Sequence, residues 1–312
     1  MTCSLALILL AVAFGIFSST LFVWEWILGA PTQLSASILF LVTTVVCLKV
    51  FLYLRRRVPR IPFRPGRAWL FRVLPVACVG IAVVSAAFSV VQQLESVPNG
   101  GFDAFAVWNL HARFLYRGSS GAWRDMFLPA MAGSNPDYPL LLPGLVSGAW
   151  MITGTDLPLI PALLGIAFAA LSIGIVGSAV SAIAGDERGW LVALLVLATP
   201  SFLSWAPLQV ADIPIGLYML ATVVLLQFAD AWPEVRRPMM VLAGLTAGFA
   251  AWTKNEGLLF IIAVLAGYLT SFAHAGAWRR IRKSAPGCAE TGHRPVSVPS
   301  RRVRGSRTRR SI

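Results

Sequence analysis

Charged residues are scarce in this chain. Only 12% of its 312 residues are Asp, Glu, Lys or Arg, about half the share found in soluble domains. Hydrophobic residues make up 57%, and the mean hydropathy is +0.74. Apolar runs of roughly the 20 residues that a helix needs to cross a bilayer recur along the sequence. The composition therefore excludes a soluble globular domain and predicts a polytopic, all-α membrane protein.

The sequence also lacks the short motifs of common enzymes and metal sites. It contains no GxGxxG, Walker loop, HExxH or Ser-His-Asp spacing. Its four cysteines have neither metal-ligand spacing nor a disulfide framework, and we expect them to be small packing residues. His111 and His274 are expected to be polar residues of the membrane interface rather than ligands. No motif points to a cofactor, and the use of a divalent metal is left open.

Acidic residues are half as numerous as basic ones, 13 against 26. The excess positive charge concentrates at 55–67, at 279–283 and in the tail that follows. In membrane proteins such clusters mark cytoplasmic loops, a commoner cause than nucleic-acid binding. We therefore place 55–67 in the cytoplasm and expect membrane lipids, but no nucleic acid, as partners.

We predict about eight spans, grouped into four regions. The regions are N-terminal spans (1–92), an extracytoplasmic loop with interfacial helices (93–156), a transmembrane bundle (157–277) and a basic, disordered cytoplasmic tail (278–312). The first apolar run lacks a basic start and a cleavage site, so it is expected to be a retained span. The Arg-, Ser- and Pro-rich tail fits an anionic-lipid-binding segment or a truncated or frame-shifted end, and we favour the second. The predicted spans are 5–29, 34–54, 71–91, 157–184, 190–205, 213–228, 239–252 and 258–274.

The apolar run 140–154 is short for a span and contains Pro143. If it does not cross, Arg236, Arg237 and the cluster 279–283 all fall in the cytoplasm. If it does cross, these basic residues fall outside. The positive-inside rule therefore predicts a helix that lies on the outer surface without crossing.

The same parity brings three polar segments to the outer face. The first is the loop 101–143, which holds Asp103, Asp125 and Asp137. The second is the turn 206–214, which holds Asp212, and the third is the turn 253–257. We expect these segments to converge on one membrane face, where a membrane enzyme would keep its chemistry.

Asp103 opens a stretch of helical spacing that runs to Arg117. Asn109, Arg113 and Arg117 form its polar stripe, and apolar and aromatic residues fall on the other side. One interpretation is a membrane-surface helix with an acid at its positive end, its aromatics in the headgroup zone and its arginines towards phosphates. The other is that Asp103 acts as a general base on an acceptor hydroxyl.

The other candidate residues also allow two interpretations. Asp137 and Tyr138 belong to a proline-bracketed turn, where Asp is common for local reasons, but Asp137 could also bind substrate or a metal. Asp212 is either a helix cap or a group that positions a sugar. Lys254 and Glu256 form either a simple turn pair or, since ionisable groups between apolar helices are usually functional, a lipid-phosphate site.

The ordered set of these motifs resembles a known family. FDAFAVWNLHARFLYRG is followed by NPDYPLLLP, then by ATPSFL and ADIP, and then by WTKNEG, over about 101–268. This order is similar to that of the GT-C membrane glycosyltransferases, in particular the bacterial proteins similar to dolichyl-phosphate-mannose–protein mannosyltransferases (glycosyltransferase family 39-like). The chain differs by two extra spans before the loop and by a replaced C-terminal part.

The resemblance implies an inverting transferase of the bacterial inner membrane with its site on the outer face. It would move a sugar from a polyprenyl-phosphate donor to a glycan, lipid or protein acceptor. Asp103 maps to the family's base, Asp212 to the acid of the second outer loop and Lys254 to the lysine near the lipid phosphate. The substrate-binding candidates are Arg113, Arg117, Asp137, Tyr138, Asp212, Lys254 and Glu256. A transporter or channel, or an inactive fragment of such an enzyme, is the alternative.

Overall fold

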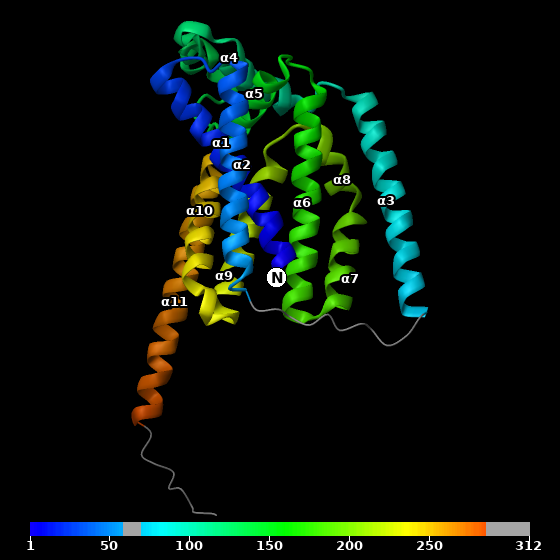
Figure 1. Ribbon diagram of the computed structural model, residues 1–312, viewed down its shortest axis with the longest axis vertical. Helices are drawn as coiled ribbons and strands as arrows, with labels where there is room; N and C mark the ends of the chain where they lie inside the picture. Colours follow the sequence, from blue (N-terminus) through cyan, green and yellow to red (C-terminus); the bar gives the residue numbers. More distant parts are fainter. Residues whose placement is uncertain (59–69, 285–312) are drawn as a thin grey trace, which may run out of the picture. The chain divides into compact units, whose positions relative to one another are not determined.

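The computed structural model describes residues 1–58 and 70–284, and every regular element in these ranges is a helix (Figure 1). The all-α prediction is therefore confirmed for this part of the chain. The chain divides into two units, Met1–Val264 and Leu265–Ile312. All of the predicted site residues belong to the first unit.

The long helices follow one another in the order that the apolar runs predict. Short helices occupy the predicted loop between α3 and α6. The elements are α1 (Thr2–Leu28), α2 (Gln33–Arg55), α3 (Leu70–Ser96), η1 (Ala104–Trp108), α4 (Asn109–Arg117), η2 (Ser119–Phe127), η3 (Pro129–Ser134), α5 (Leu141–Thr153), α6 (Leu159–Ala184), α7 (Asp186–Leu197), α8 (Pro200–Trp205), η4 (Ala206–Leu208), α9 (Asp212–Ala231), η5 (Pro233–Val235), α10 (Arg236–Thr253) and α11 (Glu256–Ser284).

Several helices are long and apolar enough to cross a membrane. Among the described residues there are four, α1, α2, α6 and α9, and a fifth if α7 and the segment Pro200–Leu208, bent by 63°, form one broken span. The break falls just before Pro200, which cannot donate a backbone hydrogen bond to the preceding turn. The chain is thus an integral multi-pass membrane protein. The predicted spans 71–91, 239–252 and 258–274 are also helical, as parts of α3, α10 and α11.

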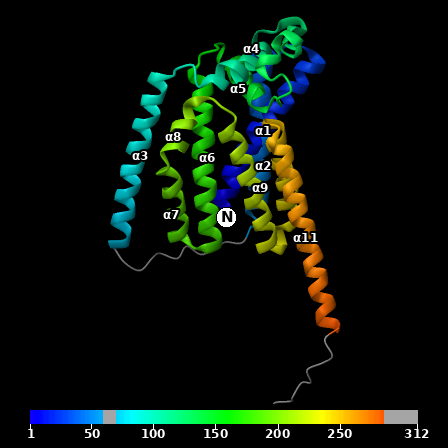
Figure 2. The ribbon, with the colours of Figure 1, turned by 180° about the vertical axis from the view of Figure 1, so that it is seen from behind.

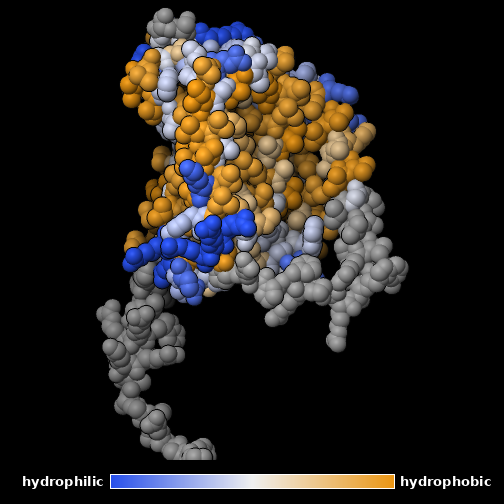
Figure 3. Space-filling model, in the orientation of Figure 1, coloured by the Kyte–Doolittle hydropathy of each residue, from blue (hydrophilic) through white to orange (hydrophobic). Residues whose placement is uncertain are grey.

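The first unit has an apolar core in which buried hydroxyl groups tie helices together. Tyr218 of α9 donates from its hydroxyl to the carbonyl of Ala11 in α1 at 3.0 Å. Thr222 and Thr246 join α9 to α10 at 2.9 Å. Such pairing is required because a polar group in apolar surroundings is costly without a partner. On the face seen in Figure 3, hydrophobic residues cover the middle of the helices and hydrophilic residues gather towards both ends.

The helix connections of this unit lie at two ends. The α1–α2, α3–α6, α8–α9 and α10–α11 connections share one end, which we call the site end (Figures 1 and 2). The α6–α7 and α9–α10 connections lie at the opposite end. Helix α5 sits at the site end beside α4, and the chain both enters and leaves it there. By length α5 belongs to the shorter apolar helices and not to the candidate spans, which agrees with the prediction that the run 140–154 does not cross.

The sequence had indicated a surface helix for this run. Helix α5 is instead largely buried within the protein. It packs against α4 on one side and against α1 and α2 on the other, and most of its side chains are buried. Gly144 and Gly148 allow this approach, because added side chains there would overlap Ser18 and Phe17 of α1. The apolar face of this short helix is thus used for protein packing rather than for contact with lipid.

Two predicted segments fall partly outside the described residues. Of the basic loop 55–67, only residues up to 58 are described, and of the tail 278–312 only residues up to 284. Helix α11 continues through Ser284, so the helix does not end at the predicted boundary of 277. The predicted disorder beyond 284 stays a prediction.

Cysteine labelling tests the arrangement of the ends. We expect Ala132→Cys in η3 and Glu234→Cys in η5, each exposed, to react with a membrane-impermeant reagent from opposite sides of the membrane. The background would carry serine at the four native cysteines. Ala132→Cys should react from outside in intact cells, and Glu234→Cys only after the membrane is opened. Labelling of both positions from the same side would contradict the arrangement.

Candidate functional site

Three polar segments that are distant in sequence meet at the site end. The Lys254 ammonium lies 3.2 Å from the Asp212 carboxylate and 3.2 Å from that of Glu256. Asn255 donates to the carboxylate of Asp137 at 3.2 Å. The turn before α11, the start of α9 and the loop before α5 are therefore in direct contact, which confirms the predicted convergence. We call these five residues the lysine centre.

The local sequence sets the position of Lys254. Helix α10 ends at Thr253, and the extended backbone of Lys254 turns the chain towards α11. The amide of Gly257 then donates to the Lys254 carbonyl at 2.9 Å. Gly257 lies so close to α10 that an added Cβ would be 2.2 Å from the backbone of Ala250. The glycine of the WTKNEG motif is thus required for close helix contact.

The environment of Lys254 keeps its side chain charged. Only 17% of the side chain is exposed, so burial acts to lower the pKa of the ammonium. Hydrogen bonds and charges from Asp212, and then from Glu256, act in the opposite direction, and the net pKa lies above its usual value. Stability gained from this raised pKa would be lost only as the pH rises through it. The lysine centre therefore presents a cation at neutral pH.

The turn before α5 is rigid and carries Asp137 and Tyr138 into the site end. Asn135 adopts a left-handed backbone with φ of 50°, which Asn tolerates better than most residues. The Tyr138 ring stacks on Trp108 with 5.2 Å between centroids and 2° between planes. Trp108 is itself 2% exposed. Tyr138 therefore fixes this turn against η1 and α4 beside the lysine centre.

Asp103 lies at the same end but outside the lysine centre. It is exposed and directly precedes η1, whose Val107 and Trp108 pack against Val210 and Ala211 just before Asp212. Among the described residues, no hydrogen bond or ion pair involves its carboxylate. The structure thus leaves Asp103 free for solvent or a ligand. Asp125, expected to be a solvated loop acid, is also exposed.

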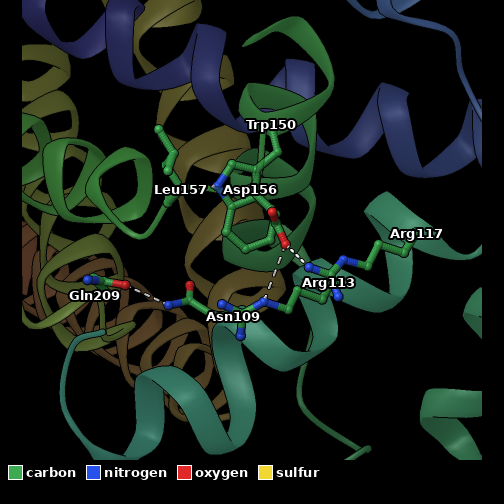
Figure 4. Close-up of polar contacts among 7 residues, drawn as sticks. All are labelled: Asn109, Arg113, Arg117, Trp150, Asp156, Leu157 and Gln209. Carbon is green, nitrogen blue, oxygen red and sulfur yellow. Dashed lines mark hydrogen bonds and ion pairs between the residues drawn. The ribbon is translucent and has the colours of Figure 1, made fainter. Parts of the chain in front are cut away.

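The two candidate arginines are held together by an acid that the sequence analysis missed. Arg117 forms an ion pair with the Asp156 carboxylate, and the Nε of Arg113 lies 3.7 Å from the same oxygen (Figure 4). The Arg113 guanidinium also lies 5.7 Å from the centre of the Trp150 ring, within range of a cation–π contact. No described contact joins this group, which we call the arginine centre, to Lys254.

Gln209 links the second polar turn to the loop. Its amide oxygen accepts from Asn109 at 2.6 Å (Figure 4). Its amide nitrogen donates to the Pro98 carbonyl at 3.2 Å. The residue is buried and has a left-handed backbone with φ of 63°, an uncommon state for glutamine. The two hydrogen bonds hold this strained turn in place.

Two further polar residues of this unit, Asp156 and Glu25, could have been recognised in the sequence as candidates. Asp156 precedes a long apolar run, where a lone acid often marks a helix start. Glu25 is a lone acid in the apolar run of α1; it is 2% exposed, and its Oε1 has no hydrogen-bond partner among the described residues. Gln209 could not have been recognised in this way, because its role depends on tertiary contacts.

Within the described residues, no group of three or more His, Cys, Asp or Glu could hold a metal ion.

His111 is fully buried rather than interfacial, which corrects the sequence-based expectation. Ser134 donates its hydroxyl to the Met131 carbonyl, so its oxygen accepts from His111 Nε2 at 3.2 Å. The other ring nitrogen, Nδ1, is then unprotonated, and it has no partner among the described residues. Burial lowers the pKa of this imidazole below its ordinary value of 6.5. The neutral ring is therefore the form that packs under η3.

Gly257→Ala tests the tight turn that positions Lys254. We expect it to destabilise the protein by about 1–3 kcal/mol, because the added methyl overlaps the backbone of α10. Thermal unfolding in detergent would measure the change. Gly244→Ala is the matched control, since open space surrounds that position in α10. Equal stability of the two variants would contradict the close approach.

Because His111 is buried in its neutral form, we predict that the protein becomes less stable at acidic pH. Because the unfolded imidazole takes up a proton at a higher pH than the buried one, folding stability should fall as the pH drops below about 6.5. The wild type should lose more thermal stability than His111→Gln between about pH 7.5 and about pH 5.5, by at most ~1.4 kcal/mol per pH unit. Parallel losses in both proteins would contradict a buried neutral His111.

Comparison with known proteins adds no family assignment. No model of a protein family, no curated protein and no solved structure matches this chain.

Proposed function

We propose that this chain is a membrane glycosyltransferase that takes its sugar from a polyprenyl-phosphate donor. The observation that carries the proposal is the lysine centre, in which a charged ammonium sits among carboxylates at one end of an apolar helix bundle. A polyprenyl-phosphate sugar has the same order of chemistry: an apolar tail, a phosphate at the interface and a hydroxyl-rich sugar beyond it. The arrangement of the motifs in the sequence supports the same proposal.

In this proposal Lys254 binds the donor phosphate. The anion would displace Asp212 or Glu256 as partner of the ammonium, and both carboxylates are exposed enough to turn away. Asp212 and Asp137 would then accept hydrogen bonds from the sugar, and Tyr138 would hold the Asp137 turn in position. We assign the donor phosphate to Lys254 rather than to Arg113 and Arg117, because the resemblance maps Lys254 to the lysine near the lipid phosphate.

Asp103 is the proposed general base. Its carboxylate is exposed and engages no described residue, and it starts the helix that packs beside the segment leading to Asp212. It would take the proton of the acceptor hydroxyl as that oxygen attacks the anomeric carbon from the side opposite the phosphate. The bond to the phosphate oxygen breaks, the polyprenyl phosphate leaves, and the configuration at the anomeric carbon inverts.

The finer topology belongs to the same proposal. About eight spans, with the site end on the outer face of a bacterial inner membrane, would place the donor tail in the bilayer and the sugar outside. The rival function is transport. Transporters place their polar sites near the membrane midplane, whereas Lys254 lies at a helix connection at one end of the first unit. This position favours the transferase.

A transfer assay tests the proposal. In membranes supplied with polyprenyl-phosphate sugars, Asp103→Asn should lower kcat by about 100-fold or more, because an amide cannot take the proton. Lys254→Met should raise the KM for the donor. The control is Asp125→Asn, which removes an exposed acid from the same loop and should leave transfer unchanged.

Two results would contradict the proposal. One is normal transfer by an Asp103→Asn protein that inserts and folds like the wild type. The other is a wild-type protein that transfers sugar from none of the polyprenyl-phosphate donors.

A further inference from the structure

A cavity of about 330 Å³ lies where the end of α3 meets the loop and the start of α6. Its size falls in the range of sites for small ligands. The wall contains the turn 96–100, Phe105, Asn109, Arg113 and Pro158. None of these residues belongs to the lysine centre. The cavity is therefore a second candidate site at the same end.

The polar side chains of this wall are held in fixed orientations. Asn109 is 3% exposed, and its amide nitrogen is engaged by Gln209, while its Oδ1 is buried without a hydrogen-bond partner among the described residues (Figure 4). Arg113 is held by Asp156 and by the ring of Trp150. The Arg113 guanidinium is thus a planar donor in a fixed position, which suits a ligand group that accepts hydrogen bonds.

Charge narrows the class of ligand. None of the described residues that line the wall is acidic. Arg113 and Arg117 share the single carboxylate of Asp156, so the arginine centre carries one net positive charge. An anionic group is the natural partner of a guanidinium that is only partly neutralised. The Phe105 ring is 49% exposed, so a flat, weakly polar ring face could lie against it.

We propose that this cavity binds a sugar unit that carries a negative charge, with its anion on Arg113 and its ring face on Phe105. As the acceptor subsite, the cavity defines the acceptor as an acidic glycan. That role rests on the proposed glycosyltransferase function, whereas the binding itself does not.

Direct binding to the purified full chain in lipid nanodiscs tests this inference. The probe is methyl glucuronoside, compared with methyl glucoside and with inorganic phosphate by saturation-transfer NMR or calorimetry. The acidic sugar should bind more tightly than either of the others. Arg113→Gln should weaken its binding at least about tenfold, because a charge-assisted contact is lost. Phe105→Ala, an exposed position that leaves the core intact, should weaken it about three- to tenfold.

Matched controls separate this cavity from general surface effects. Arg124→Gln and Phe127→Ala remove the same residue types from exposed positions in η2 that do not line the cavity, and binding should be unchanged. Equal binding of the neutral glucoside, equal affinity for phosphate alone, or wild-type binding by both cavity variants would each overturn the inference.

The binding experiment and the transfer assay separate the proposed subsite from the proposed function. Binding of the acidic sugar that depends on Arg113 and Phe105, without any transfer, would remove the glycosyltransferase role and leave the subsite. Transfer that depends on Asp103, without binding of the acidic sugar at the cavity, would overturn the subsite alone.

Discussion

The contact on which the site end depends is the ion pair between Lys254 and Asp212. A largely buried ammonium between apolar helices needs a partner, because an isolated charge in such surroundings is costly. The requirement ties the start of α9 to the turn between α10 and α11. Asn255 extends the link to Asp137, and Tyr138 extends it to Trp108. Charge neutralisation thus joins two of the three segments, and a side-chain hydrogen bond adds the third.

Much of this arrangement could be predicted from the sequence. Apolar runs indicate the long helices. The basic residues around 236 and 279 require an odd number of crossings between residue 92, which lies outside, and each of them if they share the side of 55–67. That reasoning alone brings Asp212 and Lys254 to the end that holds Asp137, as the structure does. The number of crossings decides at which end of the bundle each helix connection lies. Counting them is therefore enough to predict that Asp137, Asp212 and Lys254 lie at the same end.

The partners within the site end could not be predicted in the same way. A helical wheel places Arg113 and Arg117 on one face but says nothing of Asp156, which is supplied by another segment. Similarly, the apolar stripe with Trp108 could face lipid or protein, and packing against α5 decides for protein. Side chains that depend on contacts distant in sequence, such as Gln209, carry no local pattern.

The strained turn at Gln209 has a mechanical consequence. A left-handed backbone at a residue other than glycine stores free energy of order 1–3 kcal/mol, which only its surroundings can hold. Here two hydrogen bonds do so, and both end on residues that line the cavity, Asn109 and Pro98. The wall of the cavity therefore holds this turn in place. Asp212 follows Gln209 by three residues, so the same wall supports the segment that carries the carboxylate paired with Lys254.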